Sequence, residues 1–244
     1  MGALDKAVDI AQMEQRNLWV LYGKSGSGKT HAASTFPKPL LYIQIGDDGA
    51  NTIKNVKGIK ILRPSTLAEL KSIAIELMTD KKYATVVCDT FSMVVNEWIN
   101  ANAVQKSKRM SQQAWGDLMT DTQEFIRMWH MISLNKIVVL TCHEVTDSFE
   151  GFEDEIAPDI RPNVSKGART YLEGMSNFGV HMVVVSREVE QPDGSTKTII
   201  KHAAQIAPNP YYWVKTQKPA EVKLPNLVIN PTYDKIMGLI QAPK

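Results

Sequence analysis

The chain has 244 residues, of which 43% are apolar and 22% are charged, and its formal net charge is +2. This composition is that of an ordinary globular protein and excludes a wholly disordered or fibrous chain. The length suffices for one α/β domain with at most a small addition. Because the net charge is so small, any contact with nucleic acid must come from a local basic patch.

Cysteine usage and hydropathy indicate the compartment. The two cysteines, Cys88 and Cys142, lie in or beside apolar stretches. Two are too few for a disulfide framework and fit a reducing environment. No apolar run approaches the roughly 20 residues of a membrane span, and residues 1–15 mix charged and apolar side chains, unlike a secretory signal. We therefore expect a cytoplasmic protein with no membrane partner.

The N-terminal residues suggest a short helix. Four apolar side chains between residues 4 and 11 share helical spacing, which predicts an amphipathic helix over residues 4–15. We accordingly divide the chain into an N-terminal helical segment, residues 1–16, and a single domain, residues 17–244.

Strands and helices are expected to alternate up to residue 142. Short apolar runs predict four buried strands, over residues 17–22, 40–45, 84–88 and 137–141. One helix is expected to start at Thr66, where Glu69 follows as in a capping box. A second has an apolar stripe from Trp115 to Trp129 that we expect to face the core. This alternation predicts an α/β fold, a mostly parallel sheet with helices on both faces.

The composition changes after about residue 155, because nine of the twelve prolines lie beyond it. Apolar runs over residues 180–187 and 198–203 flank a Pro-Asp-Gly turn at 192–194, which predicts a β-hairpin. Residues 211–215 are expected to form one more strand. The C-terminal third is therefore predicted to add antiparallel strands to the parallel core.

The most specific motif spans residues 23–30, where a glycine is followed by four residues and then by Gly-Lys-Thr, between a predicted strand and a predicted helix. Glycines let such a loop curl so that its N–H groups point at phosphates, and the helix N-terminus adds partial positive charge. Lys29 suits the β- and γ-phosphates, and the Thr30 hydroxyl suits Mg²⁺. We expect ATP to contact Gly23, Lys24, Ser25, Gly26, Ser27, Gly28, Lys29, Thr30 and His31.

Polar residues also follow three other predicted strands. Asp89 ends the third strand and is the expected Mg²⁺ ligand together with Thr30 of the glycine loop, a motif known as a P-loop. Asp47 and Asp48 follow the second strand, where either carboxylate could activate water, although the pair also fits a plain Asp-Gly turn. His143 follows the fourth strand, where it could sense the γ-phosphate or serve as an ordinary surface or capping residue.

The order of these motifs resembles that of the RecA-like ATPases. More narrowly, it resembles the small phage-encoded RecA-like recombination proteins of single-strand annealing type, over about residues 17–232. The resemblance implies a RecA-like P-loop NTPase core and Mg²⁺-dependent hydrolysis of ATP to ADP and phosphate. It further implies action on single-stranded DNA in phage-type homologous recombination, annealing or repair, in the host cytoplasm if the protein is phage-encoded.

The resemblance also implies partners and an assembly. A single-strand DNA-binding protein is one implied partner, and a head-to-tail homo-oligomer is the implied assembly. In that assembly a Lys-x-Arg element reaches the neighbour's nucleotide; Lys215 matches its lysine, whereas Gln217 departs from its arginine. Relatives usually have glutamate at the position of Asp47, so the shorter aspartate implies weaker activation of water.

RecA-like proteins contact DNA through loops that follow the strands of the active face. The comparable segments are residues 91–113 and 144–171, which we expect to be loops. Phosphate neutralisation there would give salt-dependent binding of low sequence specificity, although each cation taken singly is more simply a solvated surface charge. The candidate DNA-binding residues are Lys106, Lys108, Arg109, Arg161, Lys166 and Arg169.

Two other functions remain open at this stage. A small-molecule phosphotransferase could use the same P-loop, but it would need an arginine-rich lid, for which only the cations at 106–109 are clustered. The second open function is a nucleotide-regulated binding module that hydrolyses little ATP. Release of phosphate that rises with single-stranded DNA, or transfer to a nucleoside monophosphate, would distinguish the classes.

Overall fold

The computed structural model describes residues 7–9, 15–46, 49–99, 101, 112–146, 160–191 and 195–241. The strands of the main sheet are β1 (Leu18–Tyr22), β2 (Leu40–Gln44), β3 (Ile59–Leu62), β4 (Thr85–Asp89), β5 (Ile137–Cys142), β8 (Phe178–Glu190), β9 (Thr196–Gln205), β10 (Lys215–Thr216) and β11 (Val228–Ile229). A second, two-stranded sheet consists of β6 (Glu144–Thr146) and β7 (Ile160–Pro162). The helical elements are α1 (Lys29–Ser34), η3 (Gly49–Ile53), α2 (Leu67–Leu77), α3 (Phe91–Met93), η4 (Val94–Ile99), α5 (Gln112–Ile132), α6 (Lys166–Met175) and α7 (Tyr233–Ile240).

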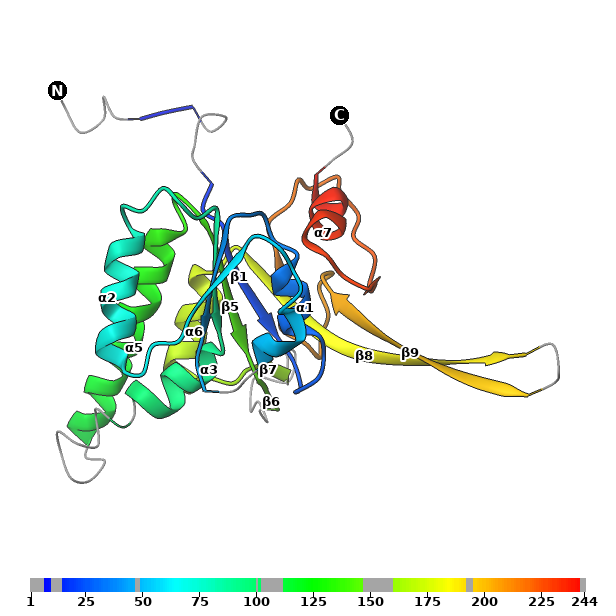
Figure 1. The fold of residues 1–244 in the computed structure, drawn as a ribbon, viewed down its shortest axis with the longest axis horizontal. Helices are drawn as coiled ribbons and strands as arrows, with labels where there is room; N and C mark the ends of the chain where they lie inside the picture. Colours follow the sequence, from blue (N-terminus) through cyan, green and yellow to red (C-terminus); the bar gives the residue numbers. More distant parts are fainter. Residues whose placement is uncertain are drawn as a thin grey trace.

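The main sheet has the strand order β11-β9-β8-β1-β5-β4-β2-β3, and β10 pairs with β8 (Figure 1). The six strands from β8 to β3 run parallel. The strands β9, β10 and β11 join antiparallel to their neighbours. The predicted α/β fold, a mostly parallel sheet with antiparallel additions near the C-terminus, is confirmed.

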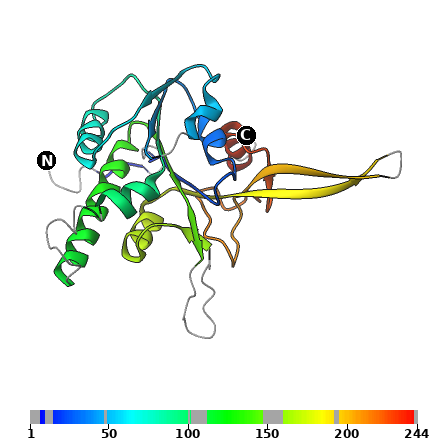
Figure 2. The same cartoon turned by 60° about the horizontal axis from the view of Figure 1, so that its bottom comes forward.

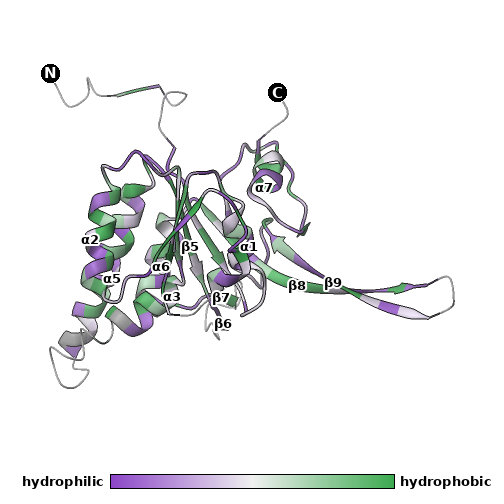
Figure 3. Ribbon diagram, viewed as in Figure 1, coloured by the Kyte–Doolittle hydropathy of each residue, from purple (hydrophilic) through white to green (hydrophobic). Residues whose placement is uncertain are grey.

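Helices cover both faces of the sheet (Figures 1 and 2). In β1, Leu18 and Val20 join the apolar cluster that includes α2, α5 and α6, whereas Trp19 and Leu21 join the cluster that includes α1 and α7. Buried strands of this kind are apolar on both sides, which explains their continuous apolar runs. Figure 3 shows hydrophilic and hydrophobic residues alternating along α2 and α5, as expected for helices with one covered side. None of the described helices is long and apolar enough to cross a membrane.

The predicted helix signals are largely confirmed. The Thr66 hydroxyl accepts a hydrogen bond from the backbone N–H of Glu69 at 3.2 Å and so caps α2. The Glu69 carboxylate accepts a hydrogen bond from the Ser65 N–H at 2.8 Å. In a standard capping box it would instead accept from the N–H of the N-cap residue, which here is Thr66. In α5, Trp129 is fully buried, as the stripe predicts, but Trp115 is 55% exposed. The prediction for Trp115 was wrong because it lies in the first turns of α5, which extend past the sheet (Figure 1).

Two further expectations need correction. Most of the expected N-terminal helix lies outside the described residues; in its described part, residues 7–9 are not helical and Val8 is 65% exposed, so its apolar side is not packed there. A short helix without such packing is marginal in water. The two segments expected to be DNA-contacting loops also contain regular structure. The first begins with α3 and η4, and the second contains β6, β7 and the start of α6.

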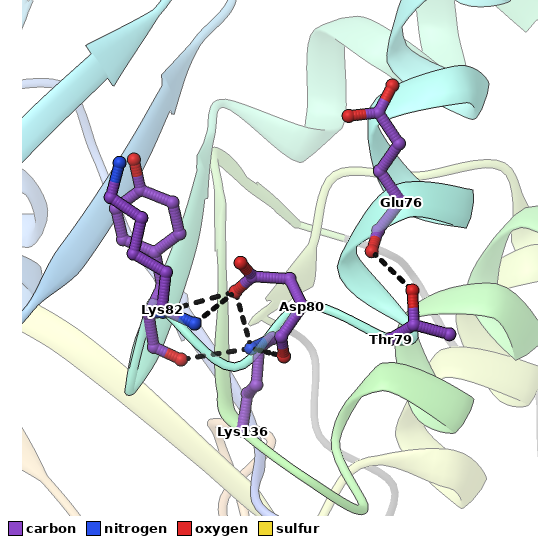
Figure 4. Close-up of polar contacts among 6 residues, drawn as sticks. Glu76, Thr79, Asp80, Lys82 and Lys136 are labelled. Atoms are coloured by element: carbon purple, nitrogen blue, oxygen red, sulfur yellow. Dashed lines mark hydrogen bonds and ion pairs between the residues drawn. The ribbon is translucent and has the colours of Figure 1, made fainter.

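A buried lysine joins two loops at the amino end of the sheet (Figure 4). The side chain of Lys136 is 2% exposed, and its Nζ donates to Asp80 Oδ2 at 2.8 Å and to the Tyr83 carbonyl at 3.0 Å. Burial raises the pKa of Asp80, but hydrogen bonds from Lys136 and from the N–H groups of Tyr83 and Lys82 outweigh it. The resulting pKa lies below the ordinary value of 3.8.

The Lys136→Met variant is expected to lower the free energy of unfolding by about 1–3 kcal/mol at pH 7, because methionine replaces the stem but leaves buried acceptors without a donor. Urea unfolding measures this, with the exposed Lys81→Met as the matched control. Since the folded pKa of Asp80 is depressed, its contribution is present above pH 3.8 and is lost as the pH falls through the folded value. The gap between wild type and variant should therefore narrow in acid; a gap that widens would contradict this account.

Candidate functional site

The carboxyl ends of β1, β2, β4 and β5 meet at one edge of the sheet, where ligands of open α/β sheets bind. The loop of residues 23–30 joins β1 to α1 at this edge. Gly28 caps α1 with a φ of 90°, and a Cβ there would lie 2.9 Å from Cγ of His202. Both the left-handed backbone and the close approach require glycine at this position. The loop is further held by a 3.3 Å hydrogen bond from the Gly23 N–H to the Cys142 carbonyl.

Lys29 is the buried cation of the loop. It is 8% exposed, and its Nζ donates to the carbonyls of Gly23 and Lys24, at 2.8 Å each. These bonds fold the side chain back along the loop, so the ammonium is held beside the N-terminus of α1. Positive charge and helix N–H groups therefore converge on one point, which suits a phosphate group.

Asp89 lies at the centre of a set of hydroxyl groups. It is 7% exposed, and its carboxylate accepts hydrogen bonds from Thr30 Oγ1, at 3.0 Å, from the Tyr42 hydroxyl and from Thr141 Oγ1. The Tyr42 and Thr141 bonds fix the carboxylate from the neighbouring strands β2 and β5. Thr30 and Asp89 together present two oxygen atoms beside the lysine, and a Mg²⁺ ion that keeps phosphate and water ligands needs no more from the protein. The residues present therefore fit this ion.

A cavity of about 300 Å³ opens between the loop and the strand ends. This volume is at the lower end of those of small-molecule sites. Its lining includes residues of the loop together with Lys29, Thr30 and Asp89. Gly49, Thr52, His143 and His202 also line it.

Of the residues expected to act on the γ-phosphate, the structure describes one and leaves two outside the described residues. His143 lines the cavity, as expected from its strand end, and its backbone N–H donates to Ser92 Oγ at 3.0 Å. Asp47 and Asp48 lie outside the described residues. The chain turns just before them at Gly46, which has a φ of 89°.

Three of the six candidate DNA-binding residues, Arg161, Lys166 and Arg169, are described by the structure. Lys106, Lys108 and Arg109 lie outside the described residues. Lys166 is exposed at the start of α6. Arg169 is 6% exposed and donates to the Val164 carbonyl at 2.9 Å, while Arg161 pairs with Glu173 at 3.4 Å. Arg161 and Arg169 therefore have structural positions, the first in the strand β7 and the second in the helix α6.

Lys215 has a structural position in this chain. Its Nζ donates to the carbonyls of Glu173 and Gly174, at 2.9 Å each, near the C-terminus of α6. Burial lowers the pKa of Lys215, and the charge of Glu173 partly opposes that shift. A contact with a neighbour's nucleotide would require the side chain to leave these carbonyls, so its placement does not favour the expected role.

A buried histidine that sequence reasoning missed joins the start of β6 to the base of β8. His181 is 2% exposed and lies between the rings of Tyr22 and Tyr212, with centroid distances of 4.8 and 4.4 Å. Its Nε2 lies 2.8 Å from Glu144 Oε2, and its Nδ1 lies 2.8 Å from Gln205 Oε1. The residue after His143 is thereby tied to the antiparallel strands. No sequence signal pointed to this cluster, because its members are far apart in the chain.

A lysine-bearing glycine loop between a buried strand and a helix, with a carboxylate at a nearby strand end, defines an α/β domain of the P-loop ATPase type. A family model described as an AAA domain, AAA_24, matches residues 16–215, and the chain belongs to this family. Among curated proteins, none shows significant similarity to the chain. The family indicates nucleotide binding and ATPase activity.

Proposed function

We propose that this protein is a Mg²⁺-dependent ATPase that acts on single-stranded DNA in phage-type recombination, annealing or repair. The observation that carries the ATPase part is the 3.0 Å contact between Thr30 and Asp89 beside the buried ammonium of Lys29. These three side chains come from two elements and converge on one cavity. Phosphoryl transfer depends mainly on such positioning and charge neutralisation.

Each residue has a separate task in this proposal. Lys29 and the loop N–H groups hold the phosphates of ATP, and Thr30 and Asp89 hold Mg²⁺. The ion supplies neutralisation of the charge that develops on the phosphates. His143, which also lines the cavity, contacts the γ-phosphate, and Asp47 or Asp48 orients the attacking water.

The single-stranded DNA part rests on the resemblance in motif order to RecA-like recombination proteins. Lys106, Lys108, Arg109 and Lys166 remain the proposed contacts in this part of the proposal. A head-to-tail homo-oligomer and a single-strand DNA-binding protein as partner belong to the same proposal. Binding of this kind would be sensitive to salt, because each neutralised phosphate releases a counterion.

The test is ATP turnover with and without single-stranded DNA, at two salt concentrations. We expect Mg²⁺-dependent release of phosphate that rises severalfold with single-stranded DNA, with the stimulation smaller at the higher salt concentration. Turnover that does not respond to DNA would refute the DNA part alone. Transfer of the phosphate to a nucleoside monophosphate would instead indicate a phosphotransferase, and nucleotide binding without turnover would indicate a binding module.

A further inference from the structure

The hairpin of β8 and β9 continues far beyond the sheet (Figures 1 and 2). Pairing of β8 with β1 ends at His181, and pairing of β9 with β11 involves only Ala203 and Ala204. Among the described strands, residues 184–190 and 196–202 pair with each other and with no third strand, and at the base the Asn230 N–H donates to the His202 carbonyl at 2.8 Å. We call these residues the outer ribbon. Seven residues of each strand span about 23 Å. An isolated two-stranded ribbon is only marginally stable in water. A ligand that binds the outer ribbon would therefore also stabilise it.

The two faces of the outer ribbon carry opposite charges. Residues paired across antiparallel strands share a face, and faces alternate along each strand. The pairs Val185–Lys201, Arg187–Ile199 and Val189–Lys197 therefore lie on one face, which we call the cationic face. Its described residues include three cations and no acid. The other face carries Glu188 and Glu190, which pair with Thr198 and Thr196.

The cations of the cationic face are available for a ligand. Arg187, Lys197 and Lys201 are all exposed, and none of their side chains forms a hydrogen bond or ion pair with the described part of the chain. The apolar residues between them, Val185, Val189 and Ile199, are only half-buried. The aliphatic stems of long cationic side chains commonly cover such neighbours while the charged ends remain in water. The face therefore presents charge rather than an apolar patch.

The spacing of these charges suits a row of phosphates. The three cations alternate between the strands, one in each of three successive pairs of this face. Successive pairs are about 6.8 Å apart, so the cations span about 14 Å. One strand of a DNA duplex presents about four phosphates over that length. The major groove between two such strands is also wide enough for a two-stranded ribbon.

The chemistry of the face favours paired over unpaired DNA. The described residues of the outer ribbon include no Phe, Tyr or Trp. Surfaces that bind single strands usually add aromatic side chains on which bases stack. A duplex needs no stacking, and it presents phosphates at about twice the linear density of one strand. A surface of cations and β-branched residues is therefore better matched to a duplex backbone.

We propose that the cationic face of the outer ribbon binds the phosphate backbone of duplex DNA through Arg187, Lys197 and Lys201. This adds a second nucleic-acid surface to the proposed single-strand function and does not depend on it. The ribbon begins beside the nucleotide cavity, since His202 lines that cavity from β9. By the same alternation His202 pairs with Val184 and shares the face of Glu188 and Glu190, so a duplex on the cationic face would lie on the side of the ribbon opposite to this histidine.

The test compares the wild type with a triple variant, Arg187→Gln, Lys197→Gln and Lys201→Gln. Binding of a fluorescent 20-base-pair duplex, and of a single strand of the same length, is titrated between 50 and 200 mM salt without nucleotide. We expect duplex affinity to fall about tenfold or more at the lower salt, and the slope of log K against log salt to flatten by about 2 to 3. The matched control is Glu188→Gln with Glu190→Gln on the opposite face, which should bind the duplex equally or more tightly.

Four outcomes would overturn the proposal. Unchanged duplex affinity and slope in the triple variant would place the contact elsewhere. A loss confined to the single strand would assign the face to unpaired DNA. A changed oligomeric state with unchanged duplex binding would assign it to a second copy of the chain. If the wild type shows DNA-stimulated ATP turnover but does not bind the duplex, the ribbon proposal alone is refuted. If the wild type binds the duplex through the ribbon but has no ATP turnover, the proposed ATPase activity alone is refuted.

Discussion

The Lys29→Ala variant is expected to lose ATP turnover by about 100-fold or more in kcat/KM, the loss typical of removing a preorganised group that stabilises transition-state charge. The Lys29 ammonium is 8% exposed and is held at 2.8 Å by the carbonyls of Gly23 and Lys24. Alanine removes this charge from the phosphate site. It also leaves both carbonyls without their donor, so the loop itself is expected to lose its fixed shape.

Phosphate release and binding of a fluorescent ATP analogue measure this effect separately. Lys57→Ala is the matched control, because Lys57 is an exposed lysine that does not line the cavity. Far-ultraviolet circular dichroism checks that the variant is folded. Turnover equal to that of wild type would refute the assignment of the phosphate loop. Loss of affinity in a protein whose wild type has no turnover would identify a binding module.

The fold was predictable where burial of an element produces a simple apolar pattern in the sequence. The strands β1, β2, β4 and β5 are covered on both faces, so their continuous apolar runs identified them. The edge strand β3 has three exposed residues among its four and gave no such run. The helix α6 was missed because its charged residues were assigned to a loop. Arg169 in that helix is buried, which a count of charges does not reveal.

The candidate site likewise has residues that the sequence predicts and residues that it does not. The loop, Thr30 and Asp89 follow from local motifs whose chemistry depends on nearby residues. The contacts of Tyr42 and Thr141 with Asp89 were not predicted, because each residue lies in an apolar run and reaches Asp89 only through the order of the strands. His202 comes from an antiparallel strand more than 170 residues after the loop. Contacts that depend on which strands become neighbours need the fold before they can be seen.

The Asp89→Asn variant is expected to require at least about tenfold more Mg²⁺ for half-maximal ATP turnover and to reach a lower maximum. The carboxylate accepts from three hydroxyl groups, those of Thr30, Tyr42 and Thr141. Asparagine replaces one acceptor oxygen with an NH₂ group, so at least one of these hydroxyl groups must turn to a new partner. It also removes the negative charge, and a hard cation such as Mg²⁺ prefers charged oxygen ligands.

Turnover over a magnesium titration measures the change, and excess chelator should abolish turnover of the wild type. The exposed Asp117→Asn on α5 is the matched control, because it removes the same charge from a residue that does not line the cavity. Thr30→Ala should shift the magnesium requirement in the same direction, since Thr30 lies 3.0 Å from the carboxylate. Combining Asp89→Asn with Thr30→Ala should then cost less than the sum of the two single effects, because both act on one ion. Strict additivity would show that the two residues serve separate roles.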